Sequence, residues 1–328
     1  MNTSIVFPER LVEGDEVRII APSDNLLGIG QETREYACQH FKDIGLHPDY
    51  SVHVEGRPGS RTSPIQDRII DLHDAFADDS VAAVFTATGG LHSNQLLGSI
   101  DWNLIKGNPK VFCGFSDATV LLNAVFAKTG LVTYHGPHYS SLGQKLIDPY
   151  TLSSLKDALF NRGGYKVMTS DKWSDDVWWN NQNSRELHEG AGNWVIQEGS
   201  AEGTIIGGNL TSFLLLQGTQ YMPRVDRPIL FLEDISRMSG GFFHRNLQAI
   251  AYGNQKGIAG LAIGRFSSAA TQTEETIGEI VSSIPELAGI PVIANVDFGH
   301  TEPRATFPIG GLVTIEATKS GDSTIYIK

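Results

Sequence analysis

The segment from Lys110 to Lys128 constrains the fold of this chain more than any other. A short apolar run ends abruptly at Gly114-Phe-Ser-Asp-Ala118, and a stretch with apolar residues at helical spacing follows. This layout predicts a sharp strand-to-helix turn that holds Ser116 at its top, with the start of a helix beneath the hydroxyl. A serine that caps a buried helix gives the same pattern, so the turn alone does not decide the function.

Strand-like and helix-like segments alternate along the first half of the chain. The strand-like runs are 16–21, 81–86 and 131–134, and the helix-like stretches are 32–44 and 119–128. Such alternation predicts a mostly parallel sheet with both faces covered. Ligand sites of these sheets lie beyond the carboxyl ends of the strands. We therefore expect the turns at Ser23, Gly90, Ser116 and His135 to share one edge.

A tryptophan-rich stretch, residues 166–200, interrupts this alternation and has neither a strand period nor a helix period. With 328 residues the chain is long enough for two domains that each bury a core. We expect an α/β fold in which a Rossmann-like, mostly parallel N-terminal domain covers residues 1–165. A long interdomain loop follows over 166–200, and a smaller C-terminal α/β domain covers 201–328.

Composition excludes several classes of partner. The formal net charge of −12, with no basic run to offset it, argues against nucleic acid. No apolar run reaches the length of a membrane span and the N-terminus has no signal-peptide pattern, so we expect a cytoplasmic protein without membrane contact. Cys38 and Cys113 lie in apolar surroundings, which predicts two buried thiols rather than a disulfide or a metal pair.

A serine nucleophile needs a base, and the base needs a group that orients it. His300 follows the apolar run 290–296, and Gly299 allows a tight exit from that strand. Glu233 ends a second apolar run, where an unpaired carboxylate would be costly to bury. Each residue alone has an ordinary structural explanation. Three such residues at three strand ends favour a Ser116–Glu233–His300 triad.

Backbone amides near Ser116 could stabilise an oxyanion. The amide of Asp117 follows the serine directly, which is the usual place for one donor. Gly89 or Gly90 could supply the second, because glycine lets the backbone approach a ligand closely. A phosphate-binding turn is the alternative, but residues 88–94 lack the spacing of known phosphate motifs.

Seven motifs, in this order along the chain, resemble the LD-carboxypeptidase family of serine peptidases. They are Thr-Gly-Gly-x-x-Ser-Asn-Gln-Leu-Leu (88–97), Gly-Phe-Ser-Asp (114–117), Lys-Thr-Gly-Leu-Val-Thr-Tyr-His-Gly-Pro (128–137), Gly-Gly-Asn-Leu (207–210), Leu-Phe-Leu-Glu-Asp (230–234), Ile-Gly-Arg-Phe (263–266) and Asp-Phe-Gly-His-Thr-Glu-Pro (297–303). The resemblance implies the same triad, an oxyanion hole formed by the Gly90 and Asp117 amides, a homodimer, and neither a metal nor an organic cofactor.

Two branches of that family differ in substrate. One trims the murein tetrapeptide in cell-wall recycling. The other, the microcin C immunity (MccF-like) branch, cleaves the amide between an aspartyl residue and a nucleotide, and it uses a tryptophan to stack on the adenine. The segments 88–95 and 172–179 are more similar to the immunity branch, whereas 237–241 resembles neither closely.

This resemblance implies Trp179, with Trp178 as the alternative, for base stacking, and Gly89 and Asn209 for substrate binding. The tryptophans could instead only anchor the loop. A small peptide or an aminoacyl nucleotide is thus the expected substrate. A ligand-binding protein without activity remains the alternative from another class, although it has no need of the three triad residues.

Overall fold

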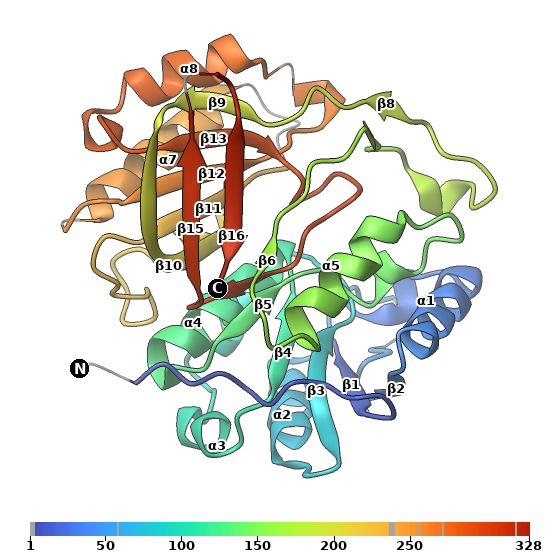
Figure 1. The fold of residues 1–328 in the computed structure, drawn as a ribbon. Coiled ribbons are helices and arrows are strands. Elements are labelled where there is room, and N and C mark those ends of the chain that lie inside the picture. Colours follow the sequence, from blue (N-terminus) through green and yellow to red (C-terminus); the bar gives the residue numbers. More distant parts are fainter. Residues whose placement is uncertain (1–3, 58, 236–239, 255, 271, 319) are drawn as a thin grey trace.

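The computed structural model describes residues 4–57, 59–235, 240–254, 256–270, 272–318 and 320–328. It contains two large mixed sheets, each with a block of parallel strands and helices packed on it (Figure 1). The first sheet fills the lower half of Figure 1 and the second fills the upper half. The predicted α/β class with two domains is confirmed.

The first sheet has the strand order β14-β5-β4-β3-β1-β2. Its strands are β1 (Glu16–Ile20), β2 (His47–Tyr50), β3 (Val81–Thr86), β4 (Val111–Gly114), β5 (Thr133–His135) and β14 (Phe307–Ile309). The first five run parallel, and β14 joins β5 antiparallel. The order 2-1-3-4-5 of the parallel strands is one of the two common arrangements of doubly wound sheets.

Helices cover both faces of this sheet. They are α1 (Gln31–Asp43), α2 (Ile65–Ala77), α3 (Trp102–Gly107), α4 (Thr119–Thr129) and α5 (Pro149–Leu159). Side chains of β3 alternate between the faces: Val84 belongs to the core with α2, α3 and α4, whereas Phe85 belongs to the core with α1 and α5. Because both faces are buried, β4 is apolar throughout and β3 is apolar up to its last residue, Thr86.

The second sheet has the strand order β6-β16-β15-β10-β11-β12-β13-β9. Its strands are β6 (Tyr165–Lys166), β9 (Trp194–Gln197), β10 (Gly199–Asn209), β11 (Ile229–Glu233), β12 (Gly260–Gly264), β13 (Val292–Val296), β15 (Leu312–Ala317) and β16 (Ser323–Ile327). Four of them, β10 to β13, run parallel. The helices of this half are α6 (Leu210–Leu214), α7 (Gly240–Gly253) and α8 (Glu274–Ser282).

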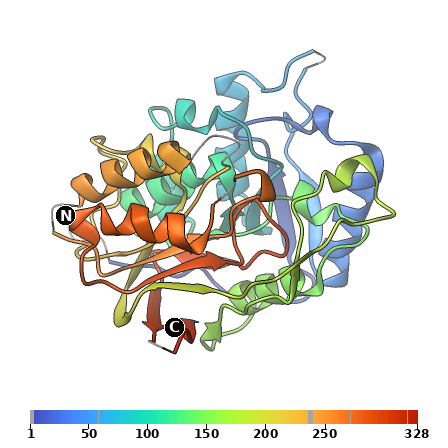
Figure 2. The same cartoon turned by 90° about the horizontal axis from the view of Figure 1, so that it is seen from above.

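The linker over 166–200 contains more regular structure than its sequence predicts. Besides the edge strand β9, it forms the small antiparallel pair β7 (Lys172–Trp173) and β8 (His188–Glu189). Strands this short bury too little surface to give a hydrophobic period, so the sequence did not predict these segments. Figure 2 shows the yellow-green linker running along one side of the molecule past both halves.

Two segments cross between the halves. The strand β14 comes from the C-terminal part of the chain but pairs with β5 of the first sheet, and β6 pairs with β16 of the second. The domain limits at 165 and 201 therefore stay a proposal. Residues 237–239, where the sequence resembles neither branch, lie outside the described residues. In the described part of the chain, no helix has both the length and the apolar character needed to span a membrane.

Candidate active site

Three turns of the first sheet meet at one edge, as the strand pattern predicts. Ser23 follows β1, Gly89 follows β3 and Ser116 follows β4. The Ser23 Oγ donates a hydrogen bond of 2.6 Å to the Asp117 carboxylate. A Cβ on Gly89 would lie 3.1 Å from the Ser116 Oγ. His135 lies nearby, as the last residue of β5.

Ser116 occupies a strained turn. Its φ of 55° is in the left-handed region that L-residues avoid. The turn passes through a short 3₁₀ segment, Ser116–Ala118, into α4. Gly114 permits this path, because a Cβ there would come within 2.3 Å of the Thr86 Oγ1. The predicted strand-turn-helix element is therefore present, with the hydroxyl lifted at its apex.

His300 reaches this hydroxyl from the other half of the molecule. It lies in the loop after β13, and its Nε2 is 3.1 Å from the Ser116 Oγ. Gly299 precedes it with a φ of +104°, and any Cβ there would lie 2.7 Å from the Glu233 Cγ. Both the backbone angle and the space require glycine at this position.

Glu233 completes the hydrogen-bonded chain. It is the last residue of β11, and its Oε2 lies 2.7 Å from the Nδ1 of His300. The side chain is buried, with 1% exposed. Burial acts to raise the pKa of Glu233, but the charge and hydrogen bond of His300 outweigh it, so this pKa lies below its ordinary value. An ionised carboxylate at this place is suited to orienting an imidazole and to stabilising its protonated form.

Asn209 lies behind Glu233. Its Nδ2 donates to the Glu233 Oε1 over 3.1 Å, and its Oδ1 caps α6 by accepting from the Ser212 amide. Its backbone amide also donates to the Thr119 Oγ1. The side chain is thus occupied in holding the carboxylate, and the substrate-binding role predicted for Asn209 stays a prediction.

The loop with Gly89 and Gly90 lies beside Ser116. Gly90 has a φ of +143°, and a Cβ there would come within 2.3 Å of the Ser23 Oγ. Within the described part of the chain, its amide donates to no acceptor. An unpaired amide in the loop beside Ser116 fits an oxyanion donor.

The side chain of Asp117 connects this loop to the turn at Ser116, which the sequence did not suggest. One oxygen, Oδ2, accepts from the Ser23 hydroxyl (2.6 Å) and from the amides of His92 (2.9 Å) and Ser93 (2.8 Å). Arg68, also buried, donates to the carbonyls of Pro22 and His92. The only hint of this contact in the sequence was that Ser23 follows a strand-like run, at the sheet edge where Ser116 was also expected.

A buried polar cluster behind Phe115 was also missed. Arg304 lies over the Phe115 ring, 4.2 Å from its centroid, and pairs with Glu302 at 2.7 Å. His138 packs against the same ring, with its Nδ1 2.6 Å from the Thr86 Oγ1. Burial, with the charge of Arg304 as the next cause, holds the pKa of His138 well below its usual value, so this imidazole is neutral.

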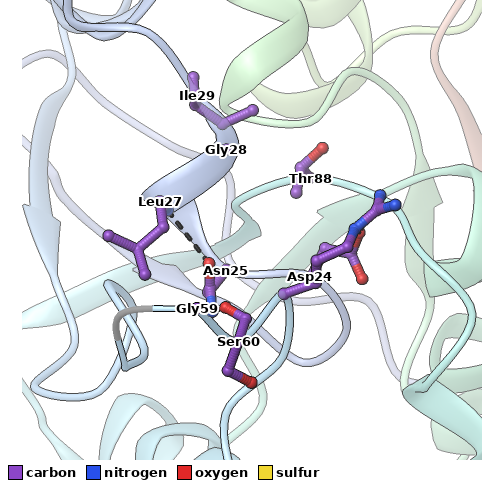
Figure 3. A pocket seen from close by; sticks show the side chains of 9 residues that line it. Asp24, Asn25, Leu27, Gly28, Ile29, Gly59, Ser60 and Thr88 are labelled. Carbon is purple, nitrogen blue, oxygen red and sulfur yellow. Dashed lines mark hydrogen bonds and ion pairs between the residues drawn. The ribbon is translucent and has the colours of Figure 1, made fainter.

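A cavity of about 390 Å³ lies next to the Gly89–Gly90 loop and includes Thr88 in its wall (Figure 3). Asp24 and Arg61 give this cavity a charged side, and Leu27 and Ile29 give it an apolar side. Its size is that of a small-molecule site. In the described part of the chain, no group of three or more His, Cys, Asp or Glu residues is placed to hold a metal ion.

Trp178 and Trp179 lie on a short 3₁₀ segment of the linker. Their rings pack edge to face, 5.5 Å apart, and Trp179 is 57% exposed. The linker approaches the His300 loop nearby, where Ser174 and Glu302 form a two-way backbone bridge. An exposed ring is available for stacking, but the stacking role of either tryptophan stays a prediction.

Comparisons with known proteins identify the family of this chain. The model of the LD-carboxypeptidase N-terminal domain matches residues 17–136, and the model of the LD-carboxypeptidase C-terminal domain matches residues 202–315. Bacillus subtilis YocD, a carboxypeptidase by name, is 40% identical over 98% of this chain and 99% of its own length. The Escherichia coli microcin C7 self-immunity protein MccF is 30% identical over 78% of this chain and 77% of its own.

Solved structures show the same fold. The MccF-like protein from Bacillus anthracis str. Ames superposes with a TM-score of 0.95 at 43% identity, covering 98% of this chain and 99% of its own. The microcin C7 self-immunity protein MccF in complex with aspartyl sulfamoyl adenosine has a TM-score of 0.87 at 24% identity, with 98% of both chains covered.

A Bacillus subtilis protein named as a murein peptide carboxypeptidase is 28% identical over 92% of this chain and 89% of its own. The alternative of a binder without activity thus finds no support among these relatives. The chain belongs to the LD-carboxypeptidase family and is an enzyme, a serine-type carboxypeptidase.

Proposed function

We propose that the enzyme hydrolyses an amide by acyl transfer through Ser116, with His300 as general base and Glu233 as its orienting partner. The observation that carries this proposal is the continuous hydrogen-bonded chain from the Ser116 hydroxyl through His300 to Glu233. In this arrangement the imidazole removes the hydroxyl proton as the oxygen attacks the scissile carbonyl. The carboxylate stabilises the imidazolium that forms.

The amides of Gly90 and Asp117 hold the oxyanion of the tetrahedral intermediate in this mechanism. The imidazolium then gives its proton to the leaving amine, and the acyl group stays on the serine oxygen. A water molecule enters in place of the amine, His300 takes one of its protons, and the acyl-enzyme is hydrolysed. The strained φ of Ser116 supports this proposal, because nucleophile turns of this type hold the hydroxyl in the open.

The substrate we infer is an acidic aminoacyl group in amide linkage to a nucleotide, as in processed microcin C, so that the enzyme confers immunity or detoxification. Two observations support this choice. The Bacillus anthracis neighbour at 43% identity is MccF-like by name, and other MccF structures hold aspartyl sulfamoyl adenosine and glutamyl sulfamoyl guanosine. In this proposal Trp179, or Trp178, stacks on the base and the enzyme acts as a homodimer.

A second candidate is trimming of a murein tetrapeptide in cell-wall recycling. It is supported by relatives named for that activity, one from Bacillus subtilis at 28% identity and one from Pseudomonas aeruginosa at 26%. Both candidates share the chemistry at Ser116 and differ in the leaving group, which is the amine of a nucleotide in one and D-alanine in the other.

Parallel turnover assays separate the two candidates. Purified enzyme is given aspartyl sulfamoyl adenosine and a murein tetrapeptide, and kcat/KM is measured for each. Our proposal predicts the higher value for the nucleotide substrate. A higher value for the tetrapeptide would move the assignment to cell-wall recycling. Absence of turnover with both, for enzyme that is folded by circular dichroism, would contradict both candidate substrates.

A further inference from the structure

The loop after β13 brings two side chains to the turn at Ser116. His300 comes first, and its Nε2 lies 3.1 Å from the Ser116 Oγ. Arg304 follows in the same loop, and its guanidinium carbon lies 4.2 Å from the centroid of the Phe115 ring. Phe115 directly precedes Ser116 in the sequence. One loop of the second half therefore contacts two consecutive residues of the first half.

Buried partners fix the plane of the Arg304 guanidinium. Its Nη2 pairs with the Glu302 Oε1 over 2.7 Å, and its Nη1 donates to the Ser141 Oγ over 2.9 Å. The side chains of Arg304 and Glu302 are only 7% and 6% exposed. The backbone amide of Arg304 also donates to the Thr151 Oγ1 over 3.1 Å. A planar group that is held at both terminal nitrogens presents a fixed face to an aromatic ring.

The Glu302 carboxylate is itself held by other side chains. The Gln144 Nε2 donates to its Oε1 over 2.9 Å, and the Thr151 Oγ1 donates to its Oε2 over 3.3 Å. The backbone of Glu302 exchanges hydrogen bonds of 2.7 and 2.8 Å with Ser174 of the linker. These contacts offset the cost of burying a charge. Because Gln144 and Thr151 belong to the first half, they fix the position of Arg304 relative to the turn at Ser116.

Phe115 needs a firm contact because the residue after it is strained. The φ of Ser116 is 55°, and such a conformation persists only where the surrounding structure enforces it. The Phe115 side chain is buried, and its ring centroid lies 4.2 Å from that of His138 and 5.1 Å from that of His300. Arg304 adds a cation–π contact to this packing. A shift of the Phe115 ring would move the neighbouring hydroxyl away from His300.

We propose that Arg304 is a positioning residue for the reaction: its guanidinium holds Phe115 and thereby keeps the Ser116 hydroxyl at hydrogen-bonding distance from His300. The inference rests on the proposed acyl transfer at Ser116. The alternative is a salt bridge between Arg304 and Glu302 that only stabilises the fold. The two roles differ in what they require, because positioning needs the flat face on Phe115, whereas a salt bridge needs only the positive charge.

Arg304→Lys separates these roles, since lysine keeps the charge but has no planar group to stack on the ring. We expect kcat to fall by about 10- to 100-fold, the effect of a misplaced reacting group, with KM within about threefold of wild type. Phe115→Leu should cause a similar loss. The double variant should lose little more than either single variant, because both substitutions break the same contact. Both constants are measured on whichever candidate substrate gives the higher kcat/KM.

Arg18→Lys is the matched control. Arg18 lies in β1, is mostly buried, and pairs with Glu16, Asp49 and Asp78, none of which belongs to the candidate site. This variant should keep the wild-type kcat. Thermal unfolding of every variant shows whether a loss of kcat accompanies a loss of fold.

Wild-type kcat in Arg304→Lys would overturn the inference, and so would losses that multiply in the double variant. If Arg304→Lys does not fold, Phe115→Leu decides alone: a folded variant with wild-type kcat would overturn the inference, and the expected loss would support it.

A serine-directed fluorophosphonate gives a second readout that needs no substrate, because the Ser116 oxygen displaces fluoride from phosphorus. Labelling of Arg304→Lys should be about 10- to 100-fold slower than that of wild type, in line with kcat. Undiminished hydrolysis by Ser116→Ala would contradict the proposed function itself. An inactive Ser116→Ala together with a fully active Arg304→Lys would contradict only the positioning role of Arg304.

Discussion

The Nε2 of His300 lies 3.1 Å from the Oγ of Ser116, although 184 positions of sequence separate the two residues. One residue belongs to a turn of the first sheet and the other to a loop of the second. The proposed catalytic chain therefore exists only when the two halves are packed together. The β14 strand, which returns from the His300 loop to pair with β5, contributes to holding them in place.

Replacing Glu233 tests the orienting group. Glu233→Gln keeps the size of the side chain but removes the charge that stabilises the imidazolium, and its amide can favour the wrong tautomer of His300. We expect kcat to fall by about 10³- to 10⁴-fold, as in other triads. Steady-state kinetics measure this effect. A variant with more than a tenth of wild-type kcat would contradict the role assigned to Glu233.

The Asp117 carboxylate should affect kcat by holding the loop that contains Gly90 in position. Asp117→Ala removes the acceptor for Ser23, His92 and Ser93, so we expect kcat to fall by about 10²- to 10³-fold, the cost of one oxyanion donor. Asp117→Asn keeps an oxygen that can accept from the backbone amides and should retain most activity. KM should change little in both variants.

Asp71→Ala provides the control for this prediction. Asp71 is another buried carboxylate of the same half, and it accepts from the amide and ring of His53. Its loss should lower thermal stability without a matching loss of kcat. If both alanine variants lost kcat by the same factor, Asp117 would have only a structural role.

The exposed tryptophan ring should discriminate between substrates. Trp179→Ala is expected to raise KM for aspartyl sulfamoyl adenosine by about 5- to 150-fold, the range given by stacking of one base. A murein tetrapeptide has no base, so its KM should stay nearly constant. Trp178→Ala serves as the comparison, since the two rings touch. Equal losses on both substrates would favour a tryptophan that only anchors the linker.

His135 should make stability depend on pH. Burial lowers the pKa of this imidazole to about 4, whereas in the unfolded chain it is near 6.5. Between these values the unfolded state binds more protons, so the free energy of unfolding should fall by about 2 kcal/mol from pH 7 to pH 5 through this group. Above about pH 6.5, the pKa of this imidazole in the unfolded chain, both states are neutral and the group no longer changes the free energy of unfolding.

His135→Phe should remove this part of the dependence, because the ring stacks on Phe307 and phenylalanine can keep that contact. Urea unfolding at the two pH values measures it. Part of the slope should remain, since burial also lowers the pKa of His138. If the free energy of unfolding of this variant fell as steeply with pH as that of the wild type, His135 would not be the cause of the pH dependence.

Much of the candidate site could be predicted from sequence because each residue of the proposed triad ends or follows an apolar run. Strands of a doubly wound sheet place their carboxyl ends at one edge, so Ser116 could be located from local pattern alone. His300 and Glu233 follow the same logic in the second sheet. Their pairing could then be inferred from chemistry, because a buried carboxylate requires a partner.

The remaining features depend on contacts that no local pattern records. Asp117 looks like an ordinary helix-start residue, and its three donors come from two other loops. The small strands β7, β8 and β9 are identified by their hydrogen-bonded partner strands, because their sequences show no regular spacing of apolar residues. The cavity at Arg61 arises from the order of β1 and β3, which the alternation of strands and helices does not specify.

The most direct test of the account is hydrolysis of aspartyl sulfamoyl adenosine by Ser116→Ala, with calorimetric binding measured on the same preparation. We predict that kcat falls by about 10⁴-fold or more, because no nucleophile remains for His300 to activate. Binding should stay within about threefold of wild type, since the hydroxyl contributes little to ground-state affinity. Undiminished hydrolysis by this variant would contradict the assignment of Ser116.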